Sequence, residues 1–201
     1  MPLLQRIGRH YLFLLAYPVY LFQRSPGKTG SHFSPSSPLF KPSEKWDVIT
    51  STVLWSAMVG LLAFGTYEWG FMWFLKYYAG PYIVFVIWLD LVTFLHHTEP
   101  DIPWYRDGEW TFLKGALSSV DRDYGFISHI HHDIGTHVAH HIFLNIPHYN
   151  LKKATEAIKP LLGEYYHKTK EPIYTSLWNS YKKCHFVPNE GKVVYYTSHN
   201  Q

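Results

Sequence analysis

The chain has 201 residues, of which 47% are hydrophobic, 18% aromatic and only 16% charged. This is an unusually apolar composition for a soluble protein, and its length suits one domain or one domain with a membrane part. The net charge is a mild +3 and no basic stripe is interleaved with aromatic residues, which argues against a nucleic-acid partner. The single cysteine, Cys184, excludes a disulfide framework and a cysteine-rich zinc or iron–sulfur site within this chain.

The first apolar stretch, YLFLLAYPVYLF at residues 11–22, is too short to cross a bilayer and contains Pro18. We expect an interfacial helix, held at the lipid headgroups by Arg9 and Arg24. A cleaved signal peptide is disfavoured, because the QRSPGKTGSHF that follows has no small-residue cleavage site. The proline, serine and glycine residues after Arg24 predict a loop. Residues 1–45 are therefore expected to form an interfacial helix and a loop.

Two longer apolar stretches follow. The sequence VITSTVLWSAMVGLLAFGTY at 48–67 carries no charge, and YYAGPYIVFVIWLDLVTFL at 77–95 is interrupted only by Asp90. Each has roughly the 20 residues that a helix needs to cross a bilayer. Because a short link joins them, we expect a transmembrane helical hairpin within residues 46–97. The alternative is a pair of buried helices in a soluble bundle, although neither stretch shows a wide polar face.

Charged residues beside the two stretches indicate their orientation. Lys76 is the only basic residue in the link, whereas several lie outside the hairpin: Arg24, Lys28, Lys41, Lys45, Arg106, Lys114 and Arg122. The positive-inside rule therefore places both outer flanks on the cytoplasmic (or stromal) side of the membrane. Residues 98–201 are expected to form a His-rich, helical cap there. The predicted fold class is an all-α, multi-pass membrane protein.

Histidines gather after the second apolar stretch. Nine of the fourteen lie between residues 96 and 148, and six of these fall in HIHHDIGTHVAHH at 129–141. We expect this segment to be helical, although Gly135 weakens its middle. On a helix, His137, His140 and His141 share one face and can direct their imidazoles at one point.

A buried imidazole must be hydrogen-bonded or bound to a metal, so this spacing indicates a metal site. His97, at the end of the second stretch, can reach the same ion, and His132 is an additional candidate ligand. Zinc, iron and copper all accept imidazole, but a surplus of histidines beside a membrane suits two metal ions better. A single histidine in this region would more often be a hydrogen-bonded surface residue. Three of the others, His129, His131 and His148, are expected to have a structural role or to lie just outside the ligands, and not to bind the metal.

Four segments carry a resemblance to a known family: RSPGKTGSHF, HHTEPDIPWYR, DRDYGFISHIHHDIGTHVAHHIF and IPHYNLKKATEAIKP. Together they resemble the C-terminal half of membrane fatty acid desaturases, most closely the ω-3 (Δ15) acyl-lipid desaturases of cyanobacteria and plastids. The resemblance runs through nearly the whole chain, which would be part of one desaturase domain. It implies membrane helices capped by a cytosolic domain. It also implies a non-haem di-iron centre, held by three histidine boxes and one further histidine.

The family's third box, H-x-x-H-H, matches residues 137–141, and its further histidine matches the end of the second apolar stretch. The implied iron ligands are His97, His137, His140 and His141. His132 remains an additional candidate, and Asp133 and Asp123 are expected to orient imidazoles by hydrogen bonds. No catalytic side chain is implied beyond the metal ligands.

The chain also departs from the family pattern. Two earlier boxes, H-x-x-x-H and H-x-x-H-H, are missing, and the first two membrane helices are missing with them. Ser128 and His129 replace residues that are usually Asn and Lys or Asn, which makes His129 a poor ligand candidate. Asn150 stands where a histidine usually follows PHY. A two-iron site cannot be completed from this chain alone, so we expect a C-terminal fragment, and the coding DNA upstream of Met1 would test this.

The resemblance implies that the full form uses O2 and two electrons to insert a double bond on the methyl-end side of an existing one. Its substrate would be a linoleoyl chain on a membrane lipid, converted to α-linolenoyl. The electron donor would be ferredoxin in a cyanobacterium or plastid and cytochrome b5 in the endoplasmic reticulum. Two alternatives stay open: a Δ12 desaturase or hydroxylase of the same superfamily, and a non-catalytic His-rich membrane metal-binding protein or remnant.

Overall fold

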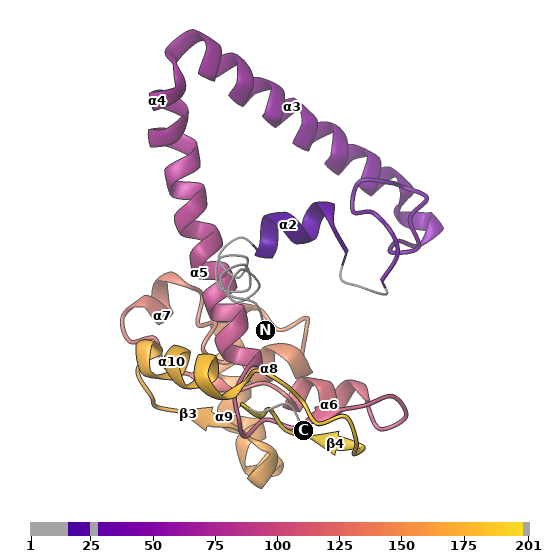
Figure 1. Ribbon diagram of the computed structural model, residues 1–201, viewed down its shortest axis with the longest axis vertical. Helices are drawn as coiled ribbons and strands as arrows, with labels where there is room; N and C mark the ends of the chain where they lie inside the picture. The colour runs from indigo at the N-terminus through magenta and orange to yellow at the C-terminus, as the bar shows by residue number, and fades with distance from the viewer. Residues whose placement is uncertain (1–15, 25–27, 199–201) are drawn as a thin grey trace. The chain divides into compact units, whose positions relative to one another are not determined.

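The structure is a computed structural model that describes residues 16–24 and 28–198 (Figure 1). Its helices fall into two units, one ending at Leu91 and the other beginning at Val92. The expected interfacial helix is described from residue 16 onward as α2 (Ala16–Phe22). Residues 11–15 of that prediction lie outside the described residues.

Two long apolar helical segments dominate the first unit, as expected. A 3-10 turn, η1 (Pro42–Glu44), leads into α3 (Lys45–Trp69). The second segment consists of α4 (Phe71–Phe74), a π-helical turn η2 (Leu75–Ala79) and α5 (Gly80–His97). Both segments are long and apolar enough to cross a membrane, and only 11% and 22% of their apolar windows are buried. A core helix of a soluble protein would be mostly buried, so the exposure favours membrane helices.

Gly70 and Pro81 explain where α3 ends and where the second segment forms a π-helical turn. Gly70 separates α3 from α4 at φ +84°, a conformation that favours glycine. Its N–H donates to the Thr66 carbonyl at 2.9 Å and closes α3. The π-helical turn ends just before Pro81, which has no N–H with which to continue the i to i−4 ladder.

Asp90 is the one charged residue in the expected second span, and it has a partner. Its carboxylate accepts a hydrogen bond from the backbone N–H of Tyr17 in α2, at 3.3 Å. Acidic residues within apolar segments are costly unless they are paired in this way.

The second unit is built from short elements around a small apolar core. Strand β1 (Trp104–Tyr105) pairs antiparallel with β4 (Val193–Val194), and β2 (Asp121–Arg122) pairs parallel with β3 (Lys168–Thr169). The helical elements are α6 (Phe112–Leu117), α7 (Ile127–Ile130), α8 (His137–Ile142), α9 (His148–Leu162), η3 (Gly163–Tyr165) and α10 (Ile173–Lys183). The core side chains include Leu95, Ile102, Val120, Val138 and Leu151. The chain is thus mostly helical, with two short strand pairs that an all-α prediction lacks.

The histidine segment, expected to be helical with a middle weakened by Gly135, is helical at its two ends and interrupted between them. The segment is split into α7 and α8 by a turn in which His132 and Asp133 have φ values of +54° and +56°. The turn passes directly over β2, where the N–H of Arg122 donates to the Gly135 carbonyl at 3.0 Å. A Cβ on Gly135 would lie 2.1 Å from the Arg122 carbonyl oxygen. The glycine is therefore required for close approach to β2 and marks the end of the turn.

Candidate metal centre

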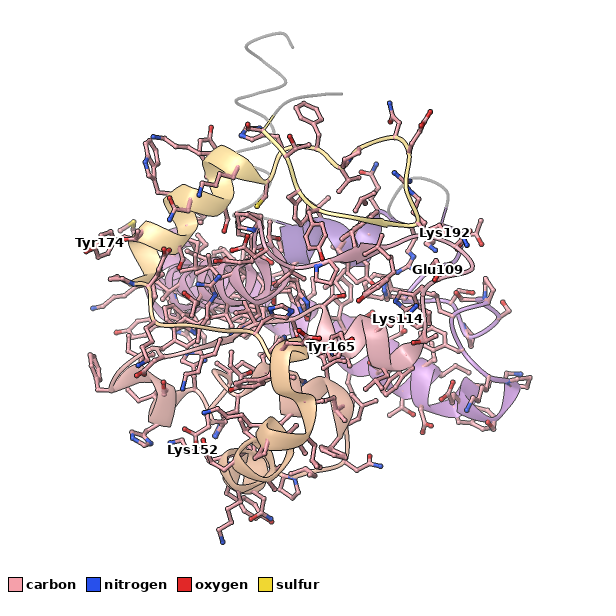
Figure 2. The ribbon with its side chains drawn as sticks, turned by 90° about the horizontal axis from the view of Figure 1, so that it is seen from below. Glu109, Lys114, Lys152, Tyr165, Tyr174 and Lys192 are labelled. Atoms are coloured by element: carbon pink, nitrogen blue, oxygen red, sulfur yellow. The ribbon has the colours of Figure 1, made fainter. Side chains whose placement is uncertain are left out.

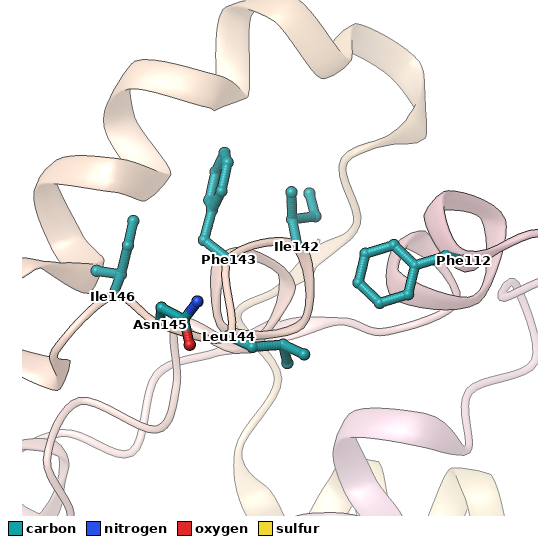
Figure 3. A pocket seen from close by; sticks show the side chains of 6 residues that line it. All are labelled: Phe112, Ile142, Phe143, Leu144, Asn145 and Ile146. Atoms are coloured by element: carbon teal, nitrogen blue, oxygen red, sulfur yellow. The ribbon is translucent and has the colours of Figure 1, made fainter.

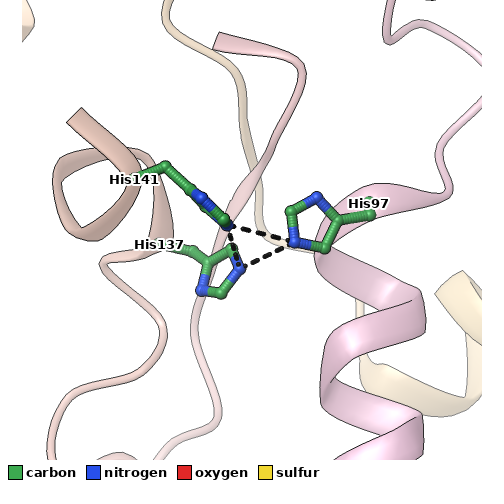
Figure 4. A group of neighbouring side chains, drawn as sticks. All are labelled: His97, His137 and His141. Atoms are coloured by element: carbon green, nitrogen blue, oxygen red, sulfur yellow. Dashed lines mark hydrogen bonds between the residues drawn. The ribbon is translucent and has the colours of Figure 1, made fainter. Parts of the chain in front are cut away.

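Three histidine side chains converge within the second unit (Figure 4). His97 is the last residue of α5, and His137 and His141 lie one turn apart on α8. The Nε2 atom of His137 lies 3.0 Å from that of His97 and 3.0 Å from that of His141. The Nε2 atoms of His141 and His97 are 3.2 Å apart. All three nitrogens therefore face one point.

Hydrogen bonding alone does not satisfy this triangle. A neutral imidazole nitrogen either carries a proton and donates, or has a lone pair and accepts, and it cannot do both. Among three mutually close nitrogens, at least one pair must then be donor against donor or acceptor against acceptor. A cation that accepts all three lone pairs removes the conflict. The arrangement therefore fits a metal better than a hydrogen-bonded core.

The spacing and the protonation of the three rings also fit a metal. Two imidazole nitrogens bound at about 2.1 Å and at right angles on one ion lie roughly 3 Å apart. Burial, followed by the neighbouring histidines, lowers the pKa of His137 far below its usual range. Burial and the neighbouring His97 and His140 lower the pKa of His141 to about 4. Both rings are thus neutral near pH 7, the form that binds metals.

Arg122 holds the end of α5, and with it His97. Its Nε donates to the Leu95 carbonyl at 2.8 Å, and its guanidinium also pairs with the Glu99 carboxylate. A third bond runs to the Ser176 hydroxyl at 2.6 Å. The last carbonyls of a helix lack partners within the helix and carry partial negative charge. A buried arginine meets both needs and fixes the position of the helix end.

His96 shows why its neighbour His97 faces the triangle. The His96 side chain is fully buried, its Nδ1 contacts the Val120 carbonyl, and its Nε2 lies 3.0 Å from the Tyr124 hydroxyl. Its ring stacks on that of His137, with centroids 4.2 Å apart and planes 21° apart. Both ring nitrogens of His96 are therefore engaged, and the ring supports a candidate ligand.

Asp121 holds the beginning of α8. Its Oδ1 accepts from the Val138 N–H at 2.8 Å, and its Oδ2 accepts from the Tyr166 hydroxyl at 2.7 Å. A carboxylate at a helix N-terminus satisfies free N–H groups and interacts favourably with the helix dipole. Burial raises the pKa of Asp121, while its hydrogen bonds oppose that shift. This carboxylate thereby fixes the turn that carries His137.

The other two candidate ligands, His140 and His132, are not part of the triangle. The His140 ring centroid is 5.5 Å from those of His137 and His141. His132 is exposed, and its ring centroid lies 4.4 Å from that of His148.

The two aspartates expected to orient imidazoles have other contacts. The Asp133 carboxylate lies 2.8 Å from the Lys152 ammonium, and the Asp123 carboxylate accepts from the Gly125 N–H at 2.8 Å. The sequence alone did not identify Asp121 and Arg122, the two residues of β2, as residues that support the site. The sequence feature that could have identified them is the DRDYG run directly before the histidine segment.

A shallow apolar pocket of about 360 Å³ lies at the C-terminal end of α8 (Figure 3). Its lining residues are Phe112, Ile142, Phe143, Leu144, Asn145 and Ile146. The helix that carries two of the three histidines thus ends in an apolar surface.

A family model described as "Fatty acid desaturase" matches residues 2–172. The chain belongs to the fatty acid desaturase family. This confirms the family inferred from the sequence motifs. Several curated relatives of this desaturase-family chain carry names that describe ω-3 desaturases.

The chain is 76% identical to the "sn-1 acyl-lipid omega-3 desaturase (ferredoxin)" of Nostoc sp., over all of this chain and 56% of that protein. It is 63% identical to the protein of the same name from Synechocystis sp., over 96% of this chain and 54% of the relative. It is 56% identical to "Omega-3 fatty acid desaturase, chloroplastic" of Glycine max, over 91% of this chain and 42% of the relative. The chain therefore spans about half the length of the relatives it matches.

Proposed function

We propose that this chain forms the His-rich part of an O2-dependent acyl-lipid ω-3 desaturase, with His97, His137 and His141 among its iron ligands. The observation that carries the proposal is the convergence of three Nε2 atoms within 3.2 Å of one another. This convergence occurs in a chain 76% identical to a relative named as an ω-3 desaturase.

Iron is the metal that the family favours, since imidazole ligands alone also suit zinc and copper. His97, His137 and His141 would hold one ion. His140 is beside them and is the proposed ligand from this chain for a second ion, with His132 as an additional candidate. Asp133 and Asp123 are proposed to orient imidazoles at the second ion, which would require their carboxylates to exchange their present partners, Lys152 and the Gly125 N–H.

The proposed reaction removes two hydrogens from adjacent carbons of an acyl chain. Its balance is R–CH2–CH2–R′ + O2 + 2 e⁻ + 2 H⁺ → R–CH=CH–R′ + 2 H2O. Bound iron supplies the activation of O2. The residues of this chain keep the imidazoles neutral by burial. They also fix the orientation of these rings through Arg122, Asp121 and His96.

The membrane arrangement is proposed on the same basis. Residues 1–45 would form an interfacial helix and loop, 46–97 a transmembrane hairpin, and 98–201 a cap on the cytoplasmic or stromal side. The substrate would be an acyl chain of a membrane lipid. Ferredoxin is the proposed electron donor, because the names of the Nostoc and Synechocystis relatives include it. Cytochrome b5 is the alternative donor.

The test is a chimera in which the chain replaces the corresponding part of the 76% identical Nostoc relative. The chimera is produced in a host that makes linoleoyl lipids and lacks ω-3 desaturase, and its fatty acids are analysed. We expect trienoic products and bound iron. The variant His137→Gln should lose both, whereas His129→Gln, whose side chain is 75% exposed, should keep both.

Other products would contradict the assignment. New dienoic chains made from monoenoic ones would indicate a Δ12 desaturase, and hydroxylated chains would indicate a hydroxylase. Stoichiometric zinc without iron, together with unchanged host lipids, would support a non-catalytic metal-binding protein.

A further inference from the structure

Helix α10 (Ile173–Lys183) begins just after the family-model match, which ends at residue 172. Its sequence IYTSLWNSYKK places three aromatic residues and a lysine at i, i+4, i+7 and i+8, which share one helix face. These residues, which we call the aromatic–lysine face, are Tyr174, Trp178, Tyr181 and Lys182. The aromatic side chains are 75%, 57% and 39% exposed in that order, and Figure 2 labels the first of them.

The opposite face of α10 is bonded to the polypeptide segment that carries His97. Ser176 and Ser180 are fully buried there. The Ser180 hydroxyl donates to the Thr98 carbonyl at 2.7 Å, and Thr98 is the residue that follows His97. One hydrogen bond and a short length of backbone therefore connect α10 with a candidate iron ligand.

The aromatic–lysine face has the chemistry of a protein-binding surface with positive charge. Exposed clusters of Trp and Tyr mark interaction sites more often than ordinary surface. The Lys182 ammonium lies 4.5 Å from the centre of the Trp178 ring. The helix itself contains two lysines and no acidic residue. The preceding Glu171 carboxylate accepts a hydrogen bond from Asn179 at 3.1 Å.

We infer that the aromatic–lysine face of α10 is the docking surface for the acidic one-electron carrier protein that reduces the metal centre. This rests on the proposed function. Positive charge on the face would attract an acidic carrier and align it, as complementary charge does in protein association. Each docking oxidises the carrier by one electron, and two dockings supply the two electrons of the desaturation. The hydrogen bond from Ser180 on the opposite face of α10 to the Thr98 carbonyl connects the helix that bears this face with the backbone beside His97.

A lipid headgroup surface is the rival occupant, since Trp, Tyr and Lys also favour membrane interfaces. Two observations favour the carrier. The face belongs to a helix bonded directly to the backbone beside His97. The relatives' names also include an electron carrier, ferredoxin.

The experiment uses the chimeric enzyme in nanodiscs and a plant-type [2Fe–2S] ferredoxin as the probe. The variant Lys182→Glu reverses the one positive charge of the aromatic–lysine face. We expect ferredoxin binding at low salt to weaken at least tenfold and to lose most of its salt dependence. The Michaelis constant for ferredoxin should rise by a similar factor, with kcat and iron content unchanged. Trp178→Ala should weaken binding without changing its salt dependence.

The matched control is Lys153→Glu, because Lys153 is an exposed lysine on α9. Equal losses in Lys153→Glu and Lys182→Glu would overturn the inference, as would unchanged ferredoxin binding in Lys182→Glu. Weaker association of Lys182→Glu with phosphatidylglycerol vesicles, at unchanged ferredoxin affinity, would assign the face to the membrane and also overturn the inference. An enzyme that makes no product at saturating ferredoxin would contradict the proposed function, while the binding measurements would still decide the docking inference.

Discussion

Helix α3 exposes apolar side chains, whereas the unit that begins at Val92 buries charged ones. Most of the large apolar residues along α3 are exposed, with Leu61 at 65% and Phe64 at 58%. The second unit instead buries charge, since Asp121 is 3% and Arg122 5% exposed. As a membrane span, α3 would need only a mainly apolar composition, so many different sequences would serve. The candidate metal centre instead needs particular atoms at particular positions, so few substitutions of its residues would preserve it.

The largest effect is expected for Gly135→Ala. A Cβ at this position would lie 2.1 Å from the Arg122 carbonyl oxygen, so the backbone must separate and the Arg122 N–H to Gly135 bond is lost. We expect destabilisation of the second unit by more than about 4 kcal/mol and loss of iron. Limited proteolysis in denaturant and metal analysis would measure both.

The control for this prediction is Gly60→Ala in α3, where an added Cβ meets no heavy atom within 4 Å among the residues that the structure describes. Alanine favours a helix by about 1 kcal/mol relative to glycine, so the control should be neutral or slightly stabilising. Equal effects at the two glycines would contradict the view that the second unit depends on individual atomic contacts and α3 does not.

The second prediction compares the stability lost with a buried ion pair to the stability lost with an exposed one. Arg122→Met leaves the Glu99 carboxylate without its guanidinium partner and removes the bond to the Leu95 carbonyl. Loss of one member of a buried pair costs about 3–5 kcal/mol. The free energy of unfolding would be measured by denaturant titration.

Lys114→Met is the matched control. Its ammonium lies 3.3 Å from the Glu109 carboxylate, which also lies 3.1 Å from Lys192 (Figure 2). Exposed pairs of this kind contribute about 1 kcal/mol or less. If the Arg122 variant were no less stable than this control, the buried pair would have no structural role.

A third prediction tests whether α3 needs only a mainly apolar composition. Met58 lies in the middle of the helix and is 47% exposed. Met58→Leu should leave membrane insertion unchanged. Met58→Arg should oppose it by about 2.5–3.5 kcal/mol, the cost of an arginine at the centre of a span. Insertion would be followed with engineered glycosylation sites in microsomes. Normal insertion of the arginine variant would count against a membrane span.

The smallest expected effect is on the reactivity of the Cys184 thiol. Burial, followed by the nearby Glu99 carboxylate, raises the pKa of the Cys184 thiol to about 12. Because the thiolate is the reactive form, iodoacetamide should modify the native chain at pH 8 at least about tenfold more slowly than the urea-unfolded chain. The native rate should rise as the pH approaches 12. Equal rates in the two states would show that Cys184 titrates normally.

Local patterns explain which features could be predicted from the sequence. The two apolar stretches each extend over many residues, and both form long helices. The H-x-x-H-H spacing brings His137 and His141 onto one face because α8 contains both. His97 was placed with them by its position at the end of an apolar stretch and by family resemblance.

The remaining features depend on partners distant in sequence. Asp121 bonds to Val138 across 17 positions, and Arg122 bonds to Ser176 across 54. Strands of two residues are too short to show an alternating pattern. The turn before α8 follows from the close approach of Gly135 to β2, which no local propensity reveals.

The triangle of His97, His137 and His141 has a consequence for the maturation of the chain. Its nitrogens belong to segments 40 residues apart, α5 and α8. In the metal-free state, at least one pair of these nitrogens repels. A bound ion would turn that repulsion into a cross-link, so metal loading and folding would become one coupled equilibrium. Supply of the ion during synthesis would then regulate how much protein survives proteolysis.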